Sequence, residues 1–335
     1  MTLAVKVQLE HAQKIKEQIH KKNIYNDNYK VKRDSKFLYI PIIQKTAGYD
    51  IVNTQLEPKD SKNRADNMLD SVLTKEERGL FPRAYEIIGD ILILEIPQEL
   101  KNKEKKIAEV YLETHKQIKT IVKKKDIHTG IYRTRKVQIL AGKRKKETMY
   151  RESGLRFKVN IEKVYFSSRL ANERLRIAKL VKKDEEVLIM FSGAAPYVCV
   201  IAKHTSAKKV TGIEINPDAH RYAEENIKLN KIKNAEVYCG DVNAILPKLK
   251  RKYDRIAMPL PKTSEEFLPL ALRHIKPGGT IHFYTFLGEK EIVSEQKKIK
   301  QICAASKKKC RILKCAHVGQ HSPRVWRVCY DVKVE

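Results

Sequence analysis

Three segments in the second half of the chain combine small or acidic residues in ways that suit ligand binding. Phe191–Tyr197 reads FSGAAPY, and its small side chains let a ligand approach the backbone and the free N–H groups of the helix start that follows. Glu214 lies in GIEINP about 20 residues further on, where a carboxylate can accept hydrogen bonds from both hydroxyls of a ribose. Asp241 follows Gly240, and its carboxylate can accept a bond from the exocyclic amine of a purine while Val242 flanks the ring.

Together these segments predict a binding site for S-adenosylmethionine. The loop has one glycine and no GxGxxG pattern, which disfavours a dinucleotide because the close approach of a pyrophosphate needs those glycines. The alternative interpretation is that Glu214 and Asp241 are only helix N-caps in a generic α/β fold. The predicted cofactor-binding residues are Phe191, Ser192, Gly193, Ala194, Pro196, Glu214, Ile215, Asp241 and Val242.

A fourth strand-like run ends in Met258-Pro259-Leu260-Pro261. Many methyltransferases that act on nitrogen atoms place Asn-Pro-Pro-Tyr or a related sequence at this point. Two prolines would form a rigid lip beside the methyl donor, because each proline ring fixes φ. We therefore predict that Pro259 and Pro261 lie at the catalytic site; the alternative is that they only terminate the strand.

The elements that must position these residues alternate between strand and helix from about residue 170 onward. This alternation predicts a Rossmann-like α/β domain with a parallel sheet, typical of class I methyltransferases, whose strand ends carry the site. The last two strands have no helix between them, which predicts an antiparallel edge hairpin. KPGG at 276–279 is expected to be a turn. The expected strands are 185–191, 209–215, 235–241, 253–261, 280–286, 310–318 and 325–334, and the expected helices are 196–205, 217–231, 242–250, 263–275 and 289–308.

The first half of the chain predicts two small α+β domains before this methyltransferase domain. Residues 7–23 are expected to form an amphipathic helix and 36–43 a strand, whereas 52–78 are polar and are expected to form a loop-like linker. YEIIGDILILEIP places Gly89-Asp90 between two β-rich runs, a hairpin signal. A helix at 104–118 and strands at 120–124, 130–140, 147–154 and 155–166 should follow. The predicted domains are 1–60, 78–168 and 169–335.

The charge balance of the 335 residues indicates a polyanionic partner. Lys and Arg number 69 and Asp and Glu 40, a net charge of +29. Residues 101–150 alone contain 16 basic and 5 acidic residues, a balance of +11, interleaved with apolar residues as in a folded surface. Such a surface would follow nucleic-acid phosphates. The alternative is a lysine-rich proteome in which basic surfaces serve solubility alone.

Other classes of protein are disfavoured by the composition. No segment approaches the ~20 apolar residues that span a bilayer, so no membrane association is expected. The first 18 residues lack the pattern of a signal peptide, and the six cysteines form no CxxC pair, which predicts a cytoplasmic protein with reduced cysteines. A disulfide from Cys303 to Cys310 or Cys315 stays open. The histidines show no metal-binding spacing, so no metal is predicted, and no protein partner is implied.

Taken together, these motifs resemble the archaeal and eukaryotic tRNA (guanine(37)-N1)-methyltransferase family over most of the chain. The resemblance implies methyl transfer from S-adenosylmethionine to N1 of guanosine 37, beside the anticodon. It also implies that tRNA is bound through its anticodon loop and body, that the small N-terminal domain contacts the tRNA body, and that the other two domains form one catalytic unit. The matching segments are YEIIGDILILEIP, GIYRTRKVQILAG, VYFSSRLANERLRIAKLV, FSGAAPYVCVIAK, GIEINPDAHRYAEENIKLN, GDVNAIL, DRIAMPLP, KPGGTIHFY and SPRVWRVCYDV.

The chain departs from this family at Pro259. Most members have Asn-Leu-Pro where this sequence has Pro-Leu-Pro, and that Asn is thought to position the target guanine. The substitution, together with the FSGAAPY loop, resembles an archaeal subgroup that also methylates C7 of 4-demethylwyosine, a tricyclic precursor of wyosine. A lineage-specific substitution is the alternative.

Methylation of guanine N1 requires removal of its proton and stabilisation of the negative charge that grows on O6. The resemblance implies Glu173 as the base, Arg133 as the O6 stabiliser and Tyr165 as an aromatic near the cofactor and base. By themselves, a Glu at a helix start is usually a cap or surface partner, and an Arg in a basic strand is usually a phosphate contact. In the expected strand, Arg133 and Arg135 alternate and would share one face. The predicted RNA-binding residues are Arg135, Lys136, Lys143, Arg144 and Arg169, of which Arg169 could also serve in catalysis.

Three other functions remain open from the sequence. A related transferase of the wyosine pathway moves the aminocarboxypropyl group of the same cofactor, and it would share the fold and the RNA partner. A catalytically inactive tRNA-binding protein is disfavoured because Glu214, Asp241 and Glu173 are all present. A DNA methyltransferase is disfavoured because Asn-Pro-Pro-Tyr is absent.

Overall fold

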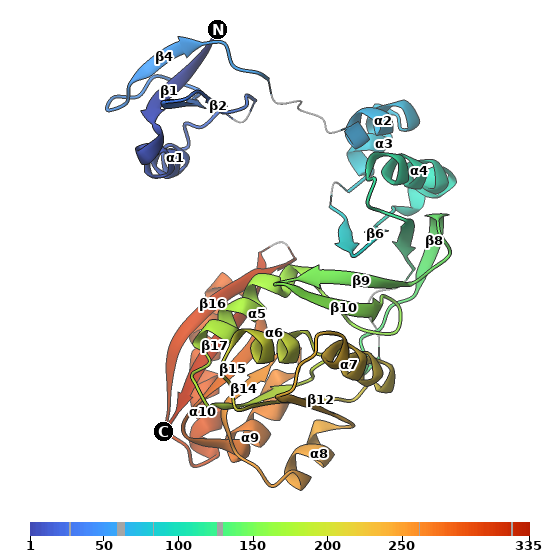
Figure 1. The fold of residues 1–335 in the computed structure, drawn as a ribbon, viewed down its shortest axis with the longest axis vertical. Coiled ribbons are helices and arrows are strands. Elements are labelled where there is room, and N and C mark those ends of the chain that lie inside the picture. Colours follow the sequence, from blue (N-terminus) through green and yellow to red (C-terminus); the bar gives the residue numbers. More distant parts are fainter. Residues whose placement is uncertain (27, 59–63, 83, 126–129, 261, 323) are drawn as a thin grey trace. The chain divides into compact units, whose positions relative to one another are not determined.

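The computed structural model describes residues 1–26, 28–58, 64–82, 84–125, 130–260, 262–322 and 324–335, and Figure 1 shows their secondary structure. Two compact units make up the chain, Met1–Arg78 and Gly79–Glu335. Among the described residues, no helix combines the length and the apolar character that crossing a bilayer would require.

The first unit contains a four-stranded antiparallel sheet in the order β2-β3-β1-β4, packed on α1. Val5 and Ile40 from the sheet and Ile19 from α1 are buried together in its core. The predicted strand at 36–43 is confirmed as β3, whereas the predicted helix at 7–23 is shorter because its first residues belong to β1. The elements are β1 (Thr2–Gln8), α1 (Ala12–Lys21), β2 (Lys32–Arg33), β3 (Phe37–Pro41), β4 (Ile51–Thr54), α2 (Arg64–Val72) and α3 (Lys75–Leu80).

The expected loop-like linker at 52–78 is wrong in its described part. This segment contains the end of β4, all of α2 and most of α3. Ala65, Leu69 and Leu73 are buried at intervals of four residues, so they form one apolar face of a helical segment. The overall polar composition of 52–78 concealed this apolar face, which only the spacing of its members reveals.

The second unit begins with a sheet in the order β5-β6-β7-β8, covered by α4. The hairpin predicted around Gly89-Asp90 is confirmed by the antiparallel pairing of β5 and β6. Gly89 has φ +58°, and a Cβ there would lie 2.6 Å from the carbonyl oxygen of Met149, so this turn requires glycine. The elements are β5 (Glu86–Ile88), β6 (Ile91–Leu94), α4 (Glu104–Thr114), β7 (Thr120–Lys124) and β8 (Val137–Gly142).

A hairpin of β9 (Glu147–Glu152) and β10 (Leu155–Asn160) joins this sheet to the rest of the unit. The Asn226 side chain accepts a hydrogen bond from the N–H of Lys158 at 2.7 Å and donates one to its carbonyl oxygen at 3.1 Å. Buried residues of the hairpin, the preceding sheet and the following sheet form one core. The subdivision at residues 168 and 169, like the other predicted domain limits, stays a prediction.

The largest sheet has seven strands in the order β13-β12-β11-β14-β15-β17-β16, and it confirms the predicted α/β fold class. β11 through β15 are parallel neighbours, and β17 runs antiparallel to both β15 and β16, which is the predicted edge hairpin. The strand order reverses between β11 and β14, so the ends of the first strands face a ligand-binding crevice. The strands are β11 (Glu186–Met190), β12 (Lys209–Glu214), β13 (Ala235–Cys239), β14 (Tyr253–Met258), β15 (Ile275–Gly288), β16 (Cys310–Ser322) and β17 (Val325–Val334).

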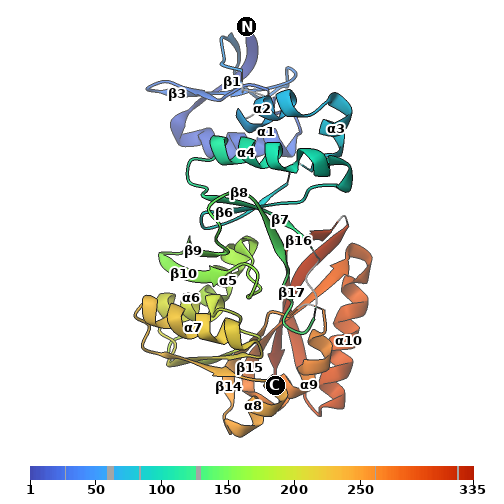
Figure 2. The ribbon, with the colours of Figure 1, turned by 90° about the vertical axis from the view of Figure 1, so that its right-hand side faces the viewer.

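Helices cover both faces of this sheet, with α6 and α7 on one side and α9 and α10 on the other (Figure 2). The alternation along β11 explains why: Val187 and Ile189 join one buried cluster, whereas Leu188 and Met190 join the other. The helices are α5 (Ala171–Leu180), α6 (Pro196–His204), α7 (Pro217–Leu229), α8 (Val242–Lys248), α9 (Ser264–His274) and α10 (Ile292–Ala305).

The KPGG segment is not a separate turn, because β15 runs continuously from Ile275 to Gly288. The pairing of β14 with β15 jumps from Tyr253–Ile275 to Arg255–Thr280, so these residues form an irregularity within the strand. Gly278 accommodates this bulge with φ +71°. The six cysteines are all free, as expected for reduced thiols.

Candidate functional site

The loop after β11 turns sharply through three residues in the left-handed region. Phe191, Gly193 and Ala195 have φ values of 61°, 56° and 62°. Two of the three are not glycine, and such backbone conformations gather at ligand sites because the surrounding structure must enforce them. The turn directs the N–H of Gly193 toward the neighbouring strand, and α6 begins directly after it at Pro196.

Glu214, at the end of β12, is buried and holds this loop in place. Its Oε2 accepts a hydrogen bond from the Gly193 N–H at 2.7 Å, and its Oε1 accepts one from the Asn216 N–H at 2.8 Å. Burial raises the pKa of Glu214, although the backbone hydrogen bonds oppose that shift. Asn216, and not Glu214, is the N-cap of α7, so the helix-cap alternative does not hold for Glu214.

Asp241 is exposed at the end of β13 and is the N-cap of α8. Its Oδ1 accepts a hydrogen bond from the Asn243 N–H at 2.8 Å. Asp241 is therefore a helix cap, as the alternative interpretation expected, and this role accounts for one hydrogen bond of its carboxylate. A carboxylate has several acceptor sites, so one cap bond leaves capacity for a ligand.

A cavity of about 590 Å³ opens at the ends of these strands. Its walls combine carboxylates with apolar side chains and glycine backbone, which suits a nucleoside with polar hydroxyls and an apolar base. Of the predicted site residues, those lining it are Phe191, Gly193, Glu214, Ile215, Asp241, Val242, Pro259, Arg133 and Tyr165.

Three predicted cofactor residues are not among those lining this cavity. Ser192 and Ala194 are both buried. Ser192 packs against Gly212 of β12, where an added Cβ would lie 2.9 Å from the serine Oγ. Pro196 is the first residue of α6 and is half-buried. Pro261 lies outside the described residues.

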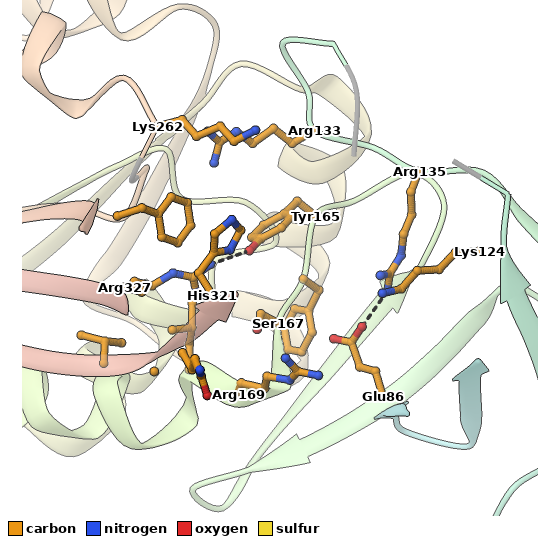
Figure 3. A pocket seen from close by; sticks show the side chains of 16 residues that line it. Glu86, Lys124, Arg133, Arg135, Tyr165, Ser167, Arg169, Lys262, His321 and Arg327 are labelled. Atoms are coloured by element: carbon orange, nitrogen blue, oxygen red, sulfur yellow. Dashed lines mark hydrogen bonds and ion pairs between the residues drawn. The ribbon is translucent and has the colours of Figure 1, made fainter. Parts of the chain in front are cut away.

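A second cavity of about 300 Å³ adjoins the first, and Arg133, Tyr165 and Lys262 line both. Figure 3 shows basic and aromatic side chains converging on it from several segments of the chain. Tyr165 lies at its centre, where its hydroxyl accepts a hydrogen bond from Arg327 at 3.1 Å. The junction therefore places an aromatic ring and three cations beside the predicted cofactor cavity.

Arg133 lies in a turn with φ +49°, not in the strand expected at 130–140. β8 begins only at Val137, so the expectation that Arg133 and Arg135 share one strand face is wrong. The alternating pattern misled because a turn precedes the strand. Burial, followed by repulsion from Arg327, lowers the pKa of Arg133, while Tyr165 opposes that change.

Arg135 is buried and donates a hydrogen bond from Nη2 to Glu86 at 3.0 Å. Arg135 lines the second cavity next to Glu86. It is therefore not the exposed side chain that a phosphate contact on an open surface would need. Lys136, Lys143 and Arg144 are exposed, and Arg169 is exposed on the wall of the second cavity. Their contacts with RNA stay a prediction.

Glu173 lies in the first turn of α5 and is buried. Arg176 donates to both of its oxygens at 2.7 and 2.8 Å, and the Tyr284 hydroxyl donates to Oε1 at 2.6 Å. Among the described residues that line the two cavities, Glu173 is absent. Both oxygens of the predicted base therefore already accept hydrogen bonds from other side chains.

The Arg176 guanidinium continues this buried network to Asp331 and His282. It donates to Asp331 at 2.7 Å, and His282 Nδ1 lies 2.6 Å from the other Asp331 oxygen. Arg255 donates to His282 Nε2 at 2.8 Å, which assigns the ring proton to Nδ1. Desolvation opposes charging of Asp331, but the bonds from His282 and Arg176 outweigh it and hold the pKa of this carboxyl below its usual range.

His282, Cys329 and Asp331 are close enough to share a metal ion. Their donor atoms are already engaged, since His282 bonds Asp331 on one side and Arg255 on the other. Two guanidiniums also contact this cluster, which would repel a cation. The cluster is therefore a hydrogen-bond network, and the prediction of no metal stays a prediction.

Several lining residues were missed from the sequence. Lys262, Thr263, Glu266 and Phe267 follow β14 and enter the first cavity from the start of α9. Phe286 and His321, which stack at 3.9 Å between ring centroids, enter the second cavity from β15 and β16. The first four follow the end of a parallel strand, which was a usable signal, whereas no local spacing could reveal Phe286 and His321.

Comparison with protein families gives three matches along the chain. The TRM5/TYW2 methyltransferase domain matches residues 148–313, the TYW2 N-terminal domain matches 65–145, and the tRNA methyltransferase 5 N-terminal domain matches 4–50. The matches thus extend over most of both compact units.

Individual relatives agree with these matches. The tRNA (guanine(37)-N(1))-methyltransferase Trm5b of Pyrococcus abyssi is 36% identical over 100% of this chain and 99% of its own, and its crystal structure superposes with a TM-score of 0.75. The tRNA (guanine(37)-N(1))/4-demethylwyosine(37)-methyltransferase Taw22 of Nanoarchaeum equitans is 34% identical over 66% of this chain and 90% of its own. A complex of aTrm5 with tRNALeu superposes with a TM-score of 0.71 at 29% identity, covering 99% of this chain and 100% of the other.

Proposed function

The chain belongs to the TRM5/TYW2 methyltransferase family, and on this premise we propose that it transfers a methyl group from S-adenosylmethionine to N1 of guanosine 37 in tRNA. The observation that carries this proposal is the junction of two cavities at Arg133 and Tyr165. One cavity suits a nucleoside cofactor, and the other offers cations and aromatic rings to a nucleotide. A transferred group would cross between them.

The residues of the first cavity fit S-adenosylmethionine. Each oxygen of Glu214 accepts one backbone hydrogen bond and keeps capacity to accept a ribose hydroxyl. Ile215 and Val242 offer apolar contact to an adenine ring, and Asp241 can accept a bond from its amine. The cofactor, when bound, supplies an electrophilic methyl group on a positively charged sulfur.

For the target base we propose that Arg133 stabilises the charge on O6 and that Glu173 accepts the N1 proton. Arg133 lines both cavities, and its guanidinium stays positively charged at neutral pH even with a lowered pKa. Arg176 donates hydrogen bonds to both oxygens of Glu173 and fixes the position of this side chain. A base role also requires the Tyr284–Glu173 hydrogen bond to open, since Glu173 is absent from the described lining of the cavities.

The RNA path is proposed from charge. Lys136, Lys143 and Arg144 lie exposed in the stretch with a balance of +11 and would contact phosphates near the anticodon loop, as would Arg169 at the cavity. The N-terminal domain, predicted at 1–60, would contact the tRNA body. We place the reaction in the cytoplasm because its substrate is tRNA.

The direct test incubates the full chain with S-adenosylmethionine and an unmodified tRNA transcript carrying guanosine at position 37. Nucleoside mass spectrometry should show 1-methylguanosine, and a transcript with adenosine at that position should show no product. Absence of 1-methylguanosine at saturating cofactor and tRNA would refute the proposal.

A second methylation, at C7 of 4-demethylwyosine, is favoured by the similarity to Taw22. Pro259 lines the first cavity without a side-chain amide, so it makes no hydrogen bond that would select guanine over a tricyclic base. A tRNA carrying 4-demethylwyosine should gain the mass of one methyl group. Gain of an aminocarboxypropyl group would instead assign the chain to the other transferase of this family.

A further inference from the structure

We propose that Arg327 binds a backbone phosphate next to the target nucleotide, with Lys262 and His321 beside it. This inference rests on the proposed function and adds a phosphodiester subsite to the second cavity. The cavity supplies the positive charge, and Arg327 supplies the directed donors.

The second cavity has a large excess of positive charge. Lys124, Arg133, Arg135, Arg169, Lys262 and Arg327 line it, and the one carboxylate among its described lining residues is Glu86. That carboxylate is bound to Arg135. Lys124 is also ion-paired, with Glu95. Positive charge still exceeds negative charge on the cavity wall, so an anion that entered would be attracted.

The cations gather around His321. Burial lowers the pKa of His321, and the three groups that lower it further are Arg327, Lys262 and Arg133. Each of these four side chains comes from a different segment of the chain, as Figure 3 shows. Basic side chains from separate segments thus meet at one cavity wall, which favours an anionic ligand there.

Arg327 is the member of this group that is built to hold an anion. Its guanidinium lies over the Phe286 ring at 5.3 Å from the centroid, and Phe286 in turn stacks on His321. Its Nη2 donates to the Tyr165 hydroxyl, and its Nε is buried without a hydrogen-bond partner. Within the described part of the chain, Arg327 forms no ion pair with a carboxylate.

This arrangement fixes the guanidinium plane and leaves donors available. A guanidinium has five N–H groups in a rigid fork that matches two oxygens of a phosphate. Stacking on Phe286 and the bond to Tyr165 reduce the side-chain freedom that would otherwise be lost on binding. The N–H groups of Arg327 other than the Nη2 bond to Tyr165 thus include unused donors.

On the proposed function, two anions would come near this junction, an RNA phosphodiester and the carboxylate of the cofactor's methionine tail. Arg327 lines the second cavity and is not among the described residues lining the first. A base drawn out of the anticodon loop brings its flanking phosphates with it. The position of Arg327 therefore favours the phosphodiester.

The experiment measures binding of the full-length protein to an anticodon stem-loop RNA with guanosine 37, over a range of salt concentrations, with S-adenosylhomocysteine present. Loss of one phosphate contact reduces the slope of log affinity against log salt by about 0.7–0.9. Arg327→Gln should show this reduction and Arg327→Lys should largely preserve the slope. The control is Arg311→Gln. Arg311 is exposed and lies at the start of β16, whereas His321 lies near its end, so this variant should leave the slope unchanged.

A second RNA series places a neutral methylphosphonate at either phosphate flanking the target. One of the two methylphosphonate substitutions should weaken RNA binding by the wild type. The same substitution should not weaken the already reduced RNA binding of Arg327→Gln. Cofactor affinity and the thermal midpoint serve as folding controls and should stay unchanged.

Two results would overturn the proposal: no coupling at either phosphate, or weakened cofactor binding with an unchanged salt slope, which would assign Arg327 to the methionine carboxylate. If coupling is found but the wild type forms no 1-methylguanosine, the phosphate contact stands and the proposed function fails.

Discussion

The carboxylate of Glu214 accepts a hydrogen bond from the Gly193 N–H at 2.7 Å, so the acid at the end of β12 fixes the loop that follows β11. β11 and β12 are neighbours in the sheet, and their ends lie at the same edge. The same carboxylate accepts the Asn216 N–H. One buried side chain thus connects the loop and the start of α7, and also faces the cofactor cavity.

Replacing Glu214 should weaken cofactor binding. A hydrogen bond to a charged group contributes about 1.5–3 kcal/mol, so Glu214→Gln is expected to raise the Kd for S-adenosylmethionine roughly 10- to 100-fold. Titration calorimetry measures this effect. Glu236→Gln is a suitable control, because Glu236 lies on adjacent β13 but bonds Lys209 and Arg251. Equal affinities of wild type and Glu214→Gln would remove the ribose assignment.

Cofactor binding should also depend on pH through Glu214. Burial raises the pKa of this group above its usual value of 4.5, and the protonated form is a poorer acceptor for ribose hydroxyls. Affinity should therefore fall as the pH drops through the raised pKa, and Glu214→Gln should lack that part of the pH dependence. Calorimetric titrations of wild type and variant at about pH 5 to 8, where folded proteins are usually most stable, would measure this pH dependence.

Replacing Arg133 should slow methyl transfer more than it weakens RNA binding. Removing one donor from a developing oxyanion costs about 10²–10³ in rate, so single-turnover methylation by Arg133→Ala should fall by roughly that factor. The Kd for tRNA should change only a few-fold. Arg144→Ala is the contrasting variant, since this exposed residue should affect RNA binding and its salt dependence but not the chemical step. The opposite pattern would make Arg133 a phosphate contact.

Much of the catalytic fold was predictable because local sequence and tertiary environment agree. The buried β11 lies between a helix-rich layer on each face, so its run of apolar residues and the amphipathic helices indicate the same arrangement. Glu214 and Asp241 could be located because Glu214 ends β12 and Asp241 follows the end of its parallel neighbour β13 by two residues. Strand ends, once recognised, place side chains at a common edge.

The parts that sequence could not predict depend on turns and long-range packing. Arg133 alternates with Arg135 as in a strand, but tertiary structure places it in a turn with positive φ. The partner of Arg135, Glu86, is 49 residues away in sequence. Arg327 and Phe286 meet only because β15 and β17 pair in one register, Phe286 opposite Arg327. None of these relationships leaves a local pattern.

The base assignment of Glu173 leads to a paired experiment. Glu173→Gln should keep cofactor binding but lose orders of magnitude in single-turnover methylation, since an amide cannot accept the N1 proton. Tyr284→Phe removes one hydrogen bond to Glu173 and leaves the carboxylate, so its rate should fall far less. Both variants are compared below their thermal midpoints, because each alters a buried group. An unchanged rate in Glu173→Gln would remove the assignment.

Asp331 should make the unfolding free energy of the protein depend on pH in the acidic range. Its pKa lies below the usual 3.8, because hydrogen bonds from His282 and Arg176 outweigh desolvation. A lowered pKa contributes stability that is fully present above the unfolded value of about 3.9 and is lost as the pH falls below it. The wild type should therefore lose part of its unfolding free energy below about pH 4.

Asp331→Asn should remove this contribution and leave Arg176 with less compensation in a buried site. Breaking a buried ion pair by removing one partner costs about 3–5 kcal/mol, so urea unfolding at pH 7 should show a loss of that order. The difference in unfolding free energy from the wild type should persist down to about pH 5. It should shrink below about pH 4, where Asp331 takes up a proton in the unfolded wild type. Asp218→Asn, which breaks an exposed pair with Lys163, should change stability by less than about 1 kcal/mol. Equal losses in the two variants would show that burial of the Asp331 network contributes nothing.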